Sequence, residues 1–313
     1  MKPIWLAMLV AASLASGAFS VEALAAPPKK KVVVVKKHKH VRVSAKSVRH
    51  LRTPSAVSHA KGLALKSSSA LVLDPITGAV LYEKNSNSVV PIASITKLMT
   101  AMVTLDASPD LGDTLTVSAE DVDTLKGTHS RLRVGTRLTR EEMLHLALMS
   151  SENRAAAALS RYYPGGREAF IAAMNRKAQE LGLNDTRFAD PTGLTAANVS
   201  SAHDLVKMVG AAYEYPLIRE FSTSPERRVA IAGRMQTFRN TNSLVKNRDW
   251  EIGLQKTGYI NEAGKCLVMH TWLNSKPIII VLLDSWGKLT RIADANRVKR
   301  WVESAALIRA SAG

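Results

Sequence analysis

Short apolar runs bounded by turn residues lie at both ends of the chain beyond residue 66, and they predict β-strands. Residues 70–73 and 79–83 predict a hairpin, because the Asp-Pro-Ile-Thr-Gly sequence between them supplies the proline and glycine of a turn. A periodic stretch at residues 289–307 predicts a helix near the end of the chain. Three further strands are predicted just before that helix, at residues 254–259, 265–273 and 278–284.

The region between these two groups of strands has the apolar spacing of helices. Apolar residues recur at helical spacing after Ser94, which predicts that a helix begins there. Two other helices begin with a capping sequence, Thr139 with Glu142 and Ser201 with Asp204. Besides the helix at Ser94, helices are predicted in this region at residues 139–149, 154–161, 167–181 and from 201 onward. The predicted strands therefore enclose a helical insert, and the fold class is α+β.

The first 25 residues have the pattern of a secretory signal peptide. Lys2 precedes an apolar stretch at residues 4–19, and the small residues needed for cleavage follow at 23–25. We therefore expect an exported mature protein that begins at Ala26. The apolar run at residues 267–283 is interrupted by polar side chains, so no transmembrane segment is expected in the mature form.

Residues 26–66 form a strongly basic stretch. The chain has a formal net charge of +17, and 12 lysines and arginines but no acidic residue lie between positions 27 and 66. Such a composition cannot build an apolar core, so we predict a disordered tail. Export makes an anionic envelope surface a more accessible partner than nucleic acid, and a plain solvated linker is an equally weighted alternative.

Three short runs carry the candidate chemistry: Ser-Ile-Thr-Lys at 94–97, Ser-Glu-Asn at 151–153 and Lys-Thr-Gly at 256–258. The Ser-x-x-Lys pattern also occurs at 58–61, 243–246 and 285–288, so it is weak evidence alone. The first of those lies in the basic stretch, and the other two come too late to precede both remaining runs in the required order. Lys97 lies about 300° around the predicted helix from Ser94, so its amine can reach the hydroxyl. This pairing predicts a nucleophile with its base.

An ordinary lysine is a poor base at neutral pH, because its pKa near 10.4 leaves only about one copy in 2,500 unprotonated. Burial and a second ammonium group, that of Lys256, would both lower the pKa of Lys97. We therefore predict a low-dielectric pocket around Lys97.

The three runs, in this order, resemble those of the penicillin-recognising serine enzymes, which share a fold with the serine β-lactamases. Longer stretches resemble low-molecular-mass penicillin-binding D-alanyl-D-alanine peptidases, and among these the murein DD-endopeptidases of the penicillin-binding protein 7 type. These stretches lie at residues 91–100, 148–154, 163–166, 190–194, 239–242, 256–259 and 266–269. The resemblance implies an antiparallel five-stranded sheet flanked by helices, with a helical lobe at about 110–235 inserted between its first and last strands. The catalytic domain is expected over residues 67–313, and the location is expected to be the periplasm.

The resemblance implies a catalytic role for three side chains. Ser94 is the expected acylating nucleophile and attacks the carbonyl of the penultimate D-alanine of a peptide stem. Lys97 is expected to accept the Ser94 proton, and Ser151 to relay a proton to the leaving amine.

The resemblance also implies how the substrate is held. Asn153 is expected to bind the substrate amide, while Lys256 and Thr257 bind the acceptor-side carboxylate. Gly258 and Tyr259 complete the predicted substrate-binding strand. The backbone N–H groups of Ser94 and Tyr259 are the expected oxyanion donors, and losing such a donor typically costs about 10²- to 10³-fold in rate.

Peptidoglycan peptide stems are the implied substrates and β-lactam antibiotics the implied covalent inhibitors, and neither a cofactor nor a metal is expected. An endopeptidase that cleaves cross-links is the leading prediction. A carboxypeptidase that trims pentapeptide stems and a non-catalytic envelope-binding protein are the alternatives. A β-lactamase is disfavoured, because Glu152 replaces the aspartate of the Ser-Asp-Asn run in that class. Cys266, the single cysteine, lies in an apolar run and is expected to be buried.

Overall fold

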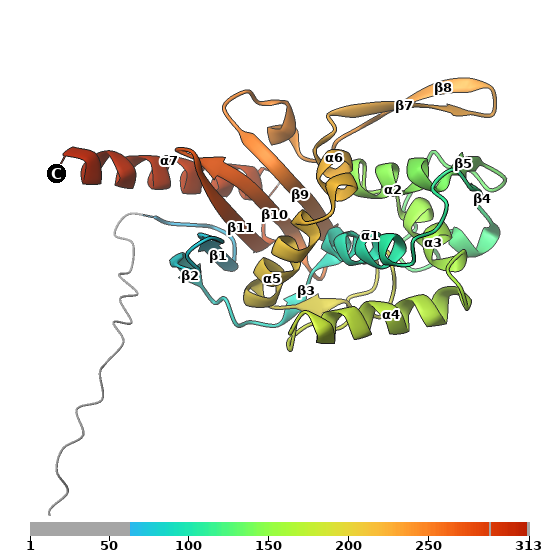
Figure 1. The fold of residues 1–313 in the computed structure, drawn as a ribbon, viewed down its shortest axis with the longest axis horizontal. Helices are drawn as coiled ribbons and strands as arrows, with labels where there is room; N and C mark the ends of the chain where they lie inside the picture. Colours follow the sequence, from blue (N-terminus) through green and yellow to red (C-terminus); the bar gives the residue numbers. More distant parts are fainter. Residues whose placement is uncertain (1–62, 288, 312–313) are drawn as a thin grey trace, which may run out of the picture. The chain divides into compact units, whose positions relative to one another are not determined.

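The structure, a computed structural model, describes residues 63–287 and 289–311, and its centre is an antiparallel five-stranded sheet (Figure 1). The strand order is β2-β1-β11-β10-β9, so the first and last parts of the domain meet between β1 and β11. The strands are β1 (Ser69–Leu73), β2 (Val80–Lys84), β9 (Glu251–Ile260), β10 (Gly264–Leu273) and β11 (Lys276–Ser285). The predicted α+β class with a five-stranded antiparallel sheet is confirmed.

Helices cover both faces of this sheet (Figure 1). One face packs against α7 (Thr290–Ser311), and the other packs against α5 (Ala202–Tyr213). The remaining helices form a lobe beside the sheet. They are α1 (Lys97–Asp106), α2 (Arg140–Met149), α3 (Asn153–Arg161), α4 (Gly166–Glu180) and α6 (Pro216–Thr223).

Alternation along the strands divides the apolar core into two layers. On β10, Leu267 and Met269 belong to the cluster under α7, whereas Cys266 and Val268 belong to the larger cluster shared with the helical lobe. Successive side chains of a strand point to opposite faces, so one strand serves both layers. Cys266 is fully buried, as predicted, and burial raises the pKa of its thiol to about 11.

Three two-stranded ribbons lie outside the predicted elements. They pair β3 (Val90–Pro91) with β6 (Val199–Ser200), β4 (Thr114–Thr116) with β5 (Arg137–Thr139), and β7 (Glu226–Ile231) with β8 (Arg234–Arg239). The hairpin of β7 and β8 extends away from the sheet beyond α2 (Figure 1). Its two-residue turn, Ala232–Gly233, has positive φ at both positions, as a tight hairpin of this kind requires. The segment expected to end the helical lobe is therefore a β-hairpin.

The N-terminal part of the described chain is packed against α7. Leu65 is buried, and the backbone N–H groups of Lys66 and Ser67 donate to the Asp294 carboxylate at 3.1 and 2.7 Å. The sequence pattern places residues 63–66 in the predicted basic tail. In the structure, the apolar side chains at 63 and 65 pack in the core. The predicted signal peptide at 1–25 and the rest of the predicted tail lie outside the described residues.

Among the described helices, none combines the length and the apolar character needed to cross a bilayer.

Candidate active site

Ser94 and Lys97 lie together at the start of the helical lobe. Ser94 belongs to a short 3₁₀ segment, η1 (Ala93–Thr96), and Lys97 is the first residue of α1. The Lys97 Nζ atom is 2.8 Å from Ser94 Oγ, so the predicted pairing is present in the structure. Ala93 has a φ of +48°, an unusual value for a residue with a Cβ atom, and such strain gathers at functional sites.

The Lys97 amine has three partners and no exposure to solvent. Besides Ser94, Nζ donates to Asn153 Oδ1 at 2.7 Å and to the Thr192 carbonyl at 2.6 Å. A carbonyl can only accept, and the Asn153 oxygen likewise only accepts. A neutral amine has two N–H groups for these two acceptors, and its lone pair is then left for the Ser94 hydroxyl. With a neutral amine, this arrangement turns the Lys97 lone pair toward the Ser94 hydroxyl, as a base for that hydroxyl requires.

Burial determines the electrostatics of this lysine. Burial lowers the pKa of Lys97 to about 7, although the Asp190 and Glu152 carboxylates favour its charged form. The predicted low-dielectric pocket is thus present. Burial also lowers the pKa of Lys256 well below its ordinary value, and the positive charges of Lys97 and Arg291 lower it further.

Ser151 contacts the second of these lysines, Lys256. It lies in the loop between α2 and α3, as predicted, with a φ of +61°. Its Oγ accepts a hydrogen bond of 2.9 Å from Lys256 Nζ, which also donates to the Thr257 carbonyl at 2.9 Å. Ser151 is therefore held by a fully buried amine on β9.

The remaining predicted binding residues follow Lys256 along β9. Thr257 Oγ1 lies 2.6 Å from the hydroxyl of Thr241. A Cβ atom at Gly258 would lie 2.8 Å from the Ile92 carbonyl oxygen and 3.2 Å from the Ser94 nitrogen. Glycine at this position thus lets β9 lie directly against the nucleophile's backbone. The Tyr259 side chain is 54% exposed, next along the strand.

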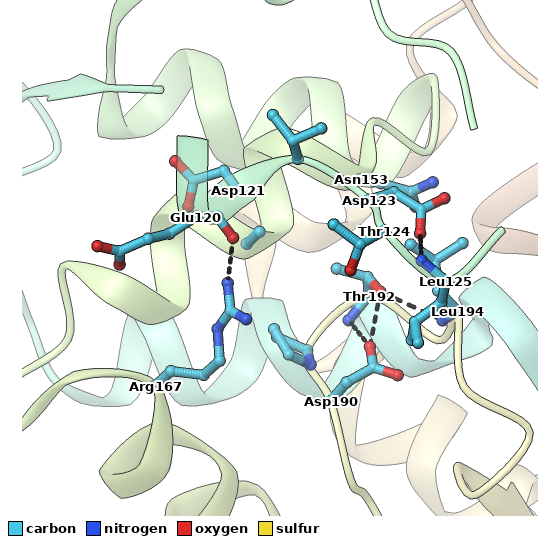
Figure 2. A pocket seen from close by; sticks show the side chains of 13 residues that line it. Glu120, Asp121, Asp123, Thr124, Leu125, Asn153, Arg167, Asp190, Thr192 and Leu194 are labelled. Carbon is cyan, nitrogen blue, oxygen red and sulfur yellow. Dashed lines mark hydrogen bonds between the residues drawn. The ribbon is translucent and has the colours of Figure 1, made fainter. Parts of the chain in front are cut away.

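The turn at residues 190–195, to which sequence reasoning gave no role, supplies one of the hydrogen-bond acceptors of Lys97. The Asp190 carboxylate accepts hydrogen bonds from the backbone N–H groups of Thr192, Gly193 and Thr195. Figure 2 shows Asp190 beside Thr192, whose carbonyl accepts the hydrogen bond from Lys97. A Cβ atom at Gly193 would lie 2.0 Å from the Ala93 carbonyl oxygen, and the φ of Gly193 is +81°. Only glycine fits such a close approach. The Asp-Pro-Thr-Gly-Leu stretch at residues 190–194 can be seen in the sequence. Its spacing alone does not reveal that this turn lies against Ala93 and Lys97.

Asn153 is held from its other side by a loop that sequence reasoning also missed. Its Nδ2 donates to Thr128 Oγ1 at 3.1 Å, and Thr128 Oγ1 donates to Asp123 Oδ2 at 2.7 Å. Burial acts to raise the pKa of Asp123, but hydrogen bonds from Thr128 and from backbone N–H groups hold it at about 2. Asp123 is therefore ionised at neutral pH and fixes the Asn153 amide with its oxygen toward Lys97. Asn153, Asp123 and Thr192 also line a cavity of about 100 Å³ (Figure 2).

Glu152 anchors the same loop. The Ser130 hydroxyl donates to Glu152 Oε2 at 2.6 Å, and the Arg154 guanidinium donates to the Leu132 carbonyl at 2.8 Å. Burial raises the pKa of Glu152, while the Ser130 hydrogen bond and nearby cationic groups oppose the shift. The middle residue of the Ser-Glu-Asn run thus holds the neighbouring loop in place.

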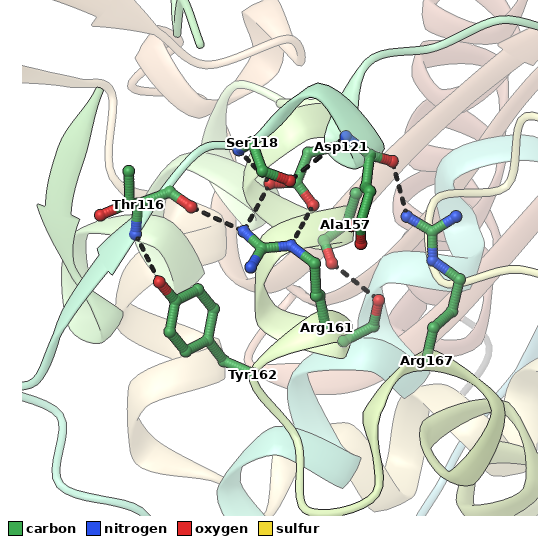
Figure 3. Close-up of polar contacts among 9 residues, drawn as sticks. Thr116, Ser118, Asp121, Ala157, Arg161, Tyr162 and Arg167 are labelled. Atoms are coloured by element: carbon green, nitrogen blue, oxygen red, sulfur yellow. Dashed lines mark hydrogen bonds and ion pairs between the residues drawn. The ribbon is translucent and has the colours of Figure 1, made fainter. Parts of the chain in front are cut away.

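An ion pair joins Arg161, the last residue of α3, to Asp121 (Figure 3). The Arg161 guanidinium donates to both carboxylate oxygens of Asp121, at 3.1 and 2.8 Å, and to the Thr116 carbonyl at 2.6 Å. The Asp121 side chain is fully buried. Removing Arg161 would leave the buried Asp121 carboxylate without its cationic partner.

Comparison with known proteins agrees with this geometry. Residues 54–287 match the model of the D-alanyl-D-alanine carboxypeptidase family of S11 peptidases. A D-alanyl-D-alanine endopeptidase of Pseudomonas aeruginosa is 52% identical over 242 residues, which are 77% of this chain and 78% of that relative. The endopeptidase of Escherichia coli is 50% identical with the same coverage.

The fold agrees as well. The crystal structure of the Streptomyces K15 DD-transpeptidase is similar with a TM-score of 0.71 and 27% identity, over 76% of this chain and 97% of that one. A D-alanyl-D-alanine carboxypeptidase of Mycobacterium tuberculosis is similar with a TM-score of 0.69 over 77% of this chain and 92% of that one, at 26% identity. The chain therefore belongs to the D-alanyl-D-alanine carboxypeptidase family and is a serine-type DD-peptidase.

Proposed function

We propose that this protein is a D-alanyl-D-alanine endopeptidase that hydrolyses peptide cross-links of peptidoglycan through an acyl-enzyme on Ser94. The observation that carries the proposal is the buried Lys97 amine, with two acceptors for its N–H groups and its third contact to Ser94 Oγ. The names of the two relatives that are 50% and 52% identical support the endopeptidase reaction over the carboxypeptidase one.

Acylation begins when the neutral Lys97 amine takes the Ser94 hydroxyl proton. Ser94 Oγ then forms a bond to the carbonyl carbon of the D-alanyl residue, and the carbonyl oxygen becomes an oxyanion. Backbone N–H groups of Ser94 and Tyr259 are the proposed donors to that oxyanion. Gly258 supports this role, because it lets β9 lie against the Ser94 backbone.

Collapse of this intermediate breaks the peptide bond and releases the amine of the neighbouring stem. Ser151 donates its hydroxyl proton to that amine, and the proton that Lys97 took from Ser94 is returned to Ser151, so that Lys97 is neutral again. Lys256 holds Ser151 Oγ in place through the 2.9 Å contact with its Nζ. Asn153 holds the substrate amide, and Thr257 with Lys256 holds the acceptor-side carboxylate. A water molecule then hydrolyses the ester on Ser94, and Lys97 is again the base that takes the proton.

The cellular setting belongs to the same proposal. The enzyme is exported by the signal at residues 1–25 and acts in the periplasm, and its basic tail attracts it to an anionic envelope surface. β-Lactams acylate Ser94 and inhibit the enzyme, because a stable ester blocks the nucleophile.

The test uses purified protein with two substrates, cross-linked muropeptide dimers and monomeric pentapeptides. We expect monomers from the dimers, and we expect Ser94→Ala to abolish this activity. Ser243→Ala is the matched control, because Ser243 begins another Ser-x-x-Lys run but is exposed in a different segment. Loss of one alanine from pentapeptides without cleavage of dimers would establish the carboxypeptidase alternative. Turnover by Ser94→Ala would overturn the mechanism.

A further inference from the structure

A second hollow lies beside the substrate-binding strand, at the ends of β9, β10 and β11. It has a volume of about 330 Å³, within the roughly 300–1,000 Å³ typical of small-molecule sites. Tyr259, Lys265 and Ser285 come from neighbouring positions in the three strands, since Lys265 pairs with both of the others. The complete lining is Tyr259, Asn261, Gly264, Lys265, Ser285, Trp286 and Gly287.

Two aromatic side chains in this hollow are unusually exposed. The Trp286 side chain is 70% exposed and Tyr259 is 54% exposed. Tryptophan and tyrosine are mostly buried in folded proteins, and their exposure in a concave site indicates a surface that binds a ligand. We propose that this hollow binds a sugar ring of the glycan chain to which the peptide substrate is attached. This proposal deepens the proposed function and rests on it.

The composition of the hollow favours a sugar over an apolar amino-acid side chain. It contains no aliphatic side chain, and apart from the two aromatic rings it is lined by amide, ammonium and hydroxyl groups and by glycine. A pyranose ring has C–H groups on its faces and hydroxyl or acetamido groups around its edge. The C–H groups pack on the negative face of an aromatic ring, and the edge groups hydrogen bond to polar side chains.

Two contacts hold this surface in place before a ligand arrives. The Tyr259 hydroxyl donates to Asn261 Oδ1 at 2.9 Å, and the Lys265 ammonium lies 4.0 Å from the centre of the Tyr259 ring. Both contacts restrict the Tyr259 side chain and so lower the entropy lost on binding.

The position of the hollow matches the chemistry of the polymer. Tyr259 directly follows Lys-Thr-Gly on β9, so the hollow begins on the strand that is proposed to hold the peptide. In peptidoglycan the stems are linked to amino sugars, and a bound stem therefore brings a sugar near its binding strand. Sugar binding here would favour polymeric substrate over free peptide.

The first experiment measures kcat/KM for cross-linked dimers that retain their sugars and for the same dimers without sugars. We expect Trp286→Ala to lower the ratio of the two values about fivefold, the size expected for loss of one aromatic contact. Ile76→Ala is the matched control, since Ile76 is 77% exposed in the turn between β1 and β2, near the opposite edge of the sheet. Penicillin acylation of each variant checks that it is folded.

The second experiment does not depend on turnover. Tetrameric N-acetylglucosamine, which carries no peptide, is titrated into the wild-type protein and into Trp286→Ala, and binding is followed by calorimetry. Binding that Trp286→Ala abolishes, with the expected fall in the ratio, supports the proposal. An unchanged ratio, an equal loss for both dimers, or equal binding by both proteins would overturn it. If the wild type cleaves neither dimer, the endopeptidase proposal fails, and the titration alone decides on sugar binding.

Discussion

The pH dependence of acylation tests the central feature of the site, the buried Lys97 amine. With a pKa of about 7, roughly half of the Lys97 side chains are neutral at pH 7, whereas a lysine of pKa 10.5 is neutral in about one copy in three thousand. Only the neutral form can accept the Ser94 proton, so acylation rises with pH as the ammonium loses its proton. Burial of the amine thus raises the reactive fraction about a thousandfold.

The expected profile follows from this one titration. The neutral fraction is about one tenth at pH 6 and about nine tenths at pH 8, so the acylation rate rises about tenfold and then reaches a plateau. The rate constant for labelling by a fluorescent penicillin is measured from pH 5.5 to 9 with excess reagent. A rate that is independent of pH over this range, or one that rises to pH 9 without a plateau, would refute the reasoning.

Glu152→Gln provides a directional check on the same titration. The Glu152 carboxylate favours the charged form of Lys97, so its removal is expected to lower the pKa of Lys97 and move the midpoint to lower pH. The glutamine oxygen can still accept the Ser130 hydrogen bond. Glu262→Gln is the control, because Glu262 pairs with Lys126 at the surface, and its midpoint is expected to stay in place. A midpoint that moves upward in Glu152→Gln would contradict the assigned electrostatics.

Three further predictions concern the groups that position the site. Thr128→Val removes the hydrogen bond from Asn153 and is expected to lower the acylation rate about tenfold, measured with the same penicillin. Gly193→Ala is expected to lower the free energy of unfolding by more than about 2 kcal/mol in urea denaturation, because its Cβ atom would collide with backbone and its φ is positive. Arg161→Met leaves the buried Asp121 charge unpaired and is expected to cost about 3–5 kcal/mol in the same assay.

Each of these predictions has a matched control. Thr128→Ser keeps a hydroxyl and is expected to retain acylation; equal loss in both variants would contradict the hydrogen-bond argument. Gly78→Ala shares a positive φ of 71° but would meet no atom within 4 Å, so it isolates the conformational cost from the collision. Arg176→Met removes an arginine from α4, where that side chain has no ion pair among the described residues, and only a small effect is expected. Similar losses for Arg161→Met and Arg176→Met would argue against the buried pair.

Local spacing in the sequence was sufficient for the elements and for one catalytic contact. The turn after residue 73, the capping box at Thr139 and the apolar runs beyond residue 250 predicted strands and helices that the structure contains. The contact between Ser94 and Lys97 followed from three residues of helical spacing. The sequence did not predict the hairpin of β7 and β8, because its charged residues fit the solvated surface of a helix as well as that of a strand.

The sequence by itself determined most of the individual strands and helices and the reactive pair, because these depend on residues close together in the chain. The pairing of β1 with β11, which places Ser69 opposite Leu283, does not follow from such local patterns. Only the tertiary structure decided what surrounds the reactive pair. The Lys97 amine donates to Asn153, 56 residues away in the chain, and to the Thr192 carbonyl, 95 residues away. Its burial requires the sheet and the lobe together. A pKa depends on the solvent and charge that the whole fold places around a group, so no local pattern could supply it.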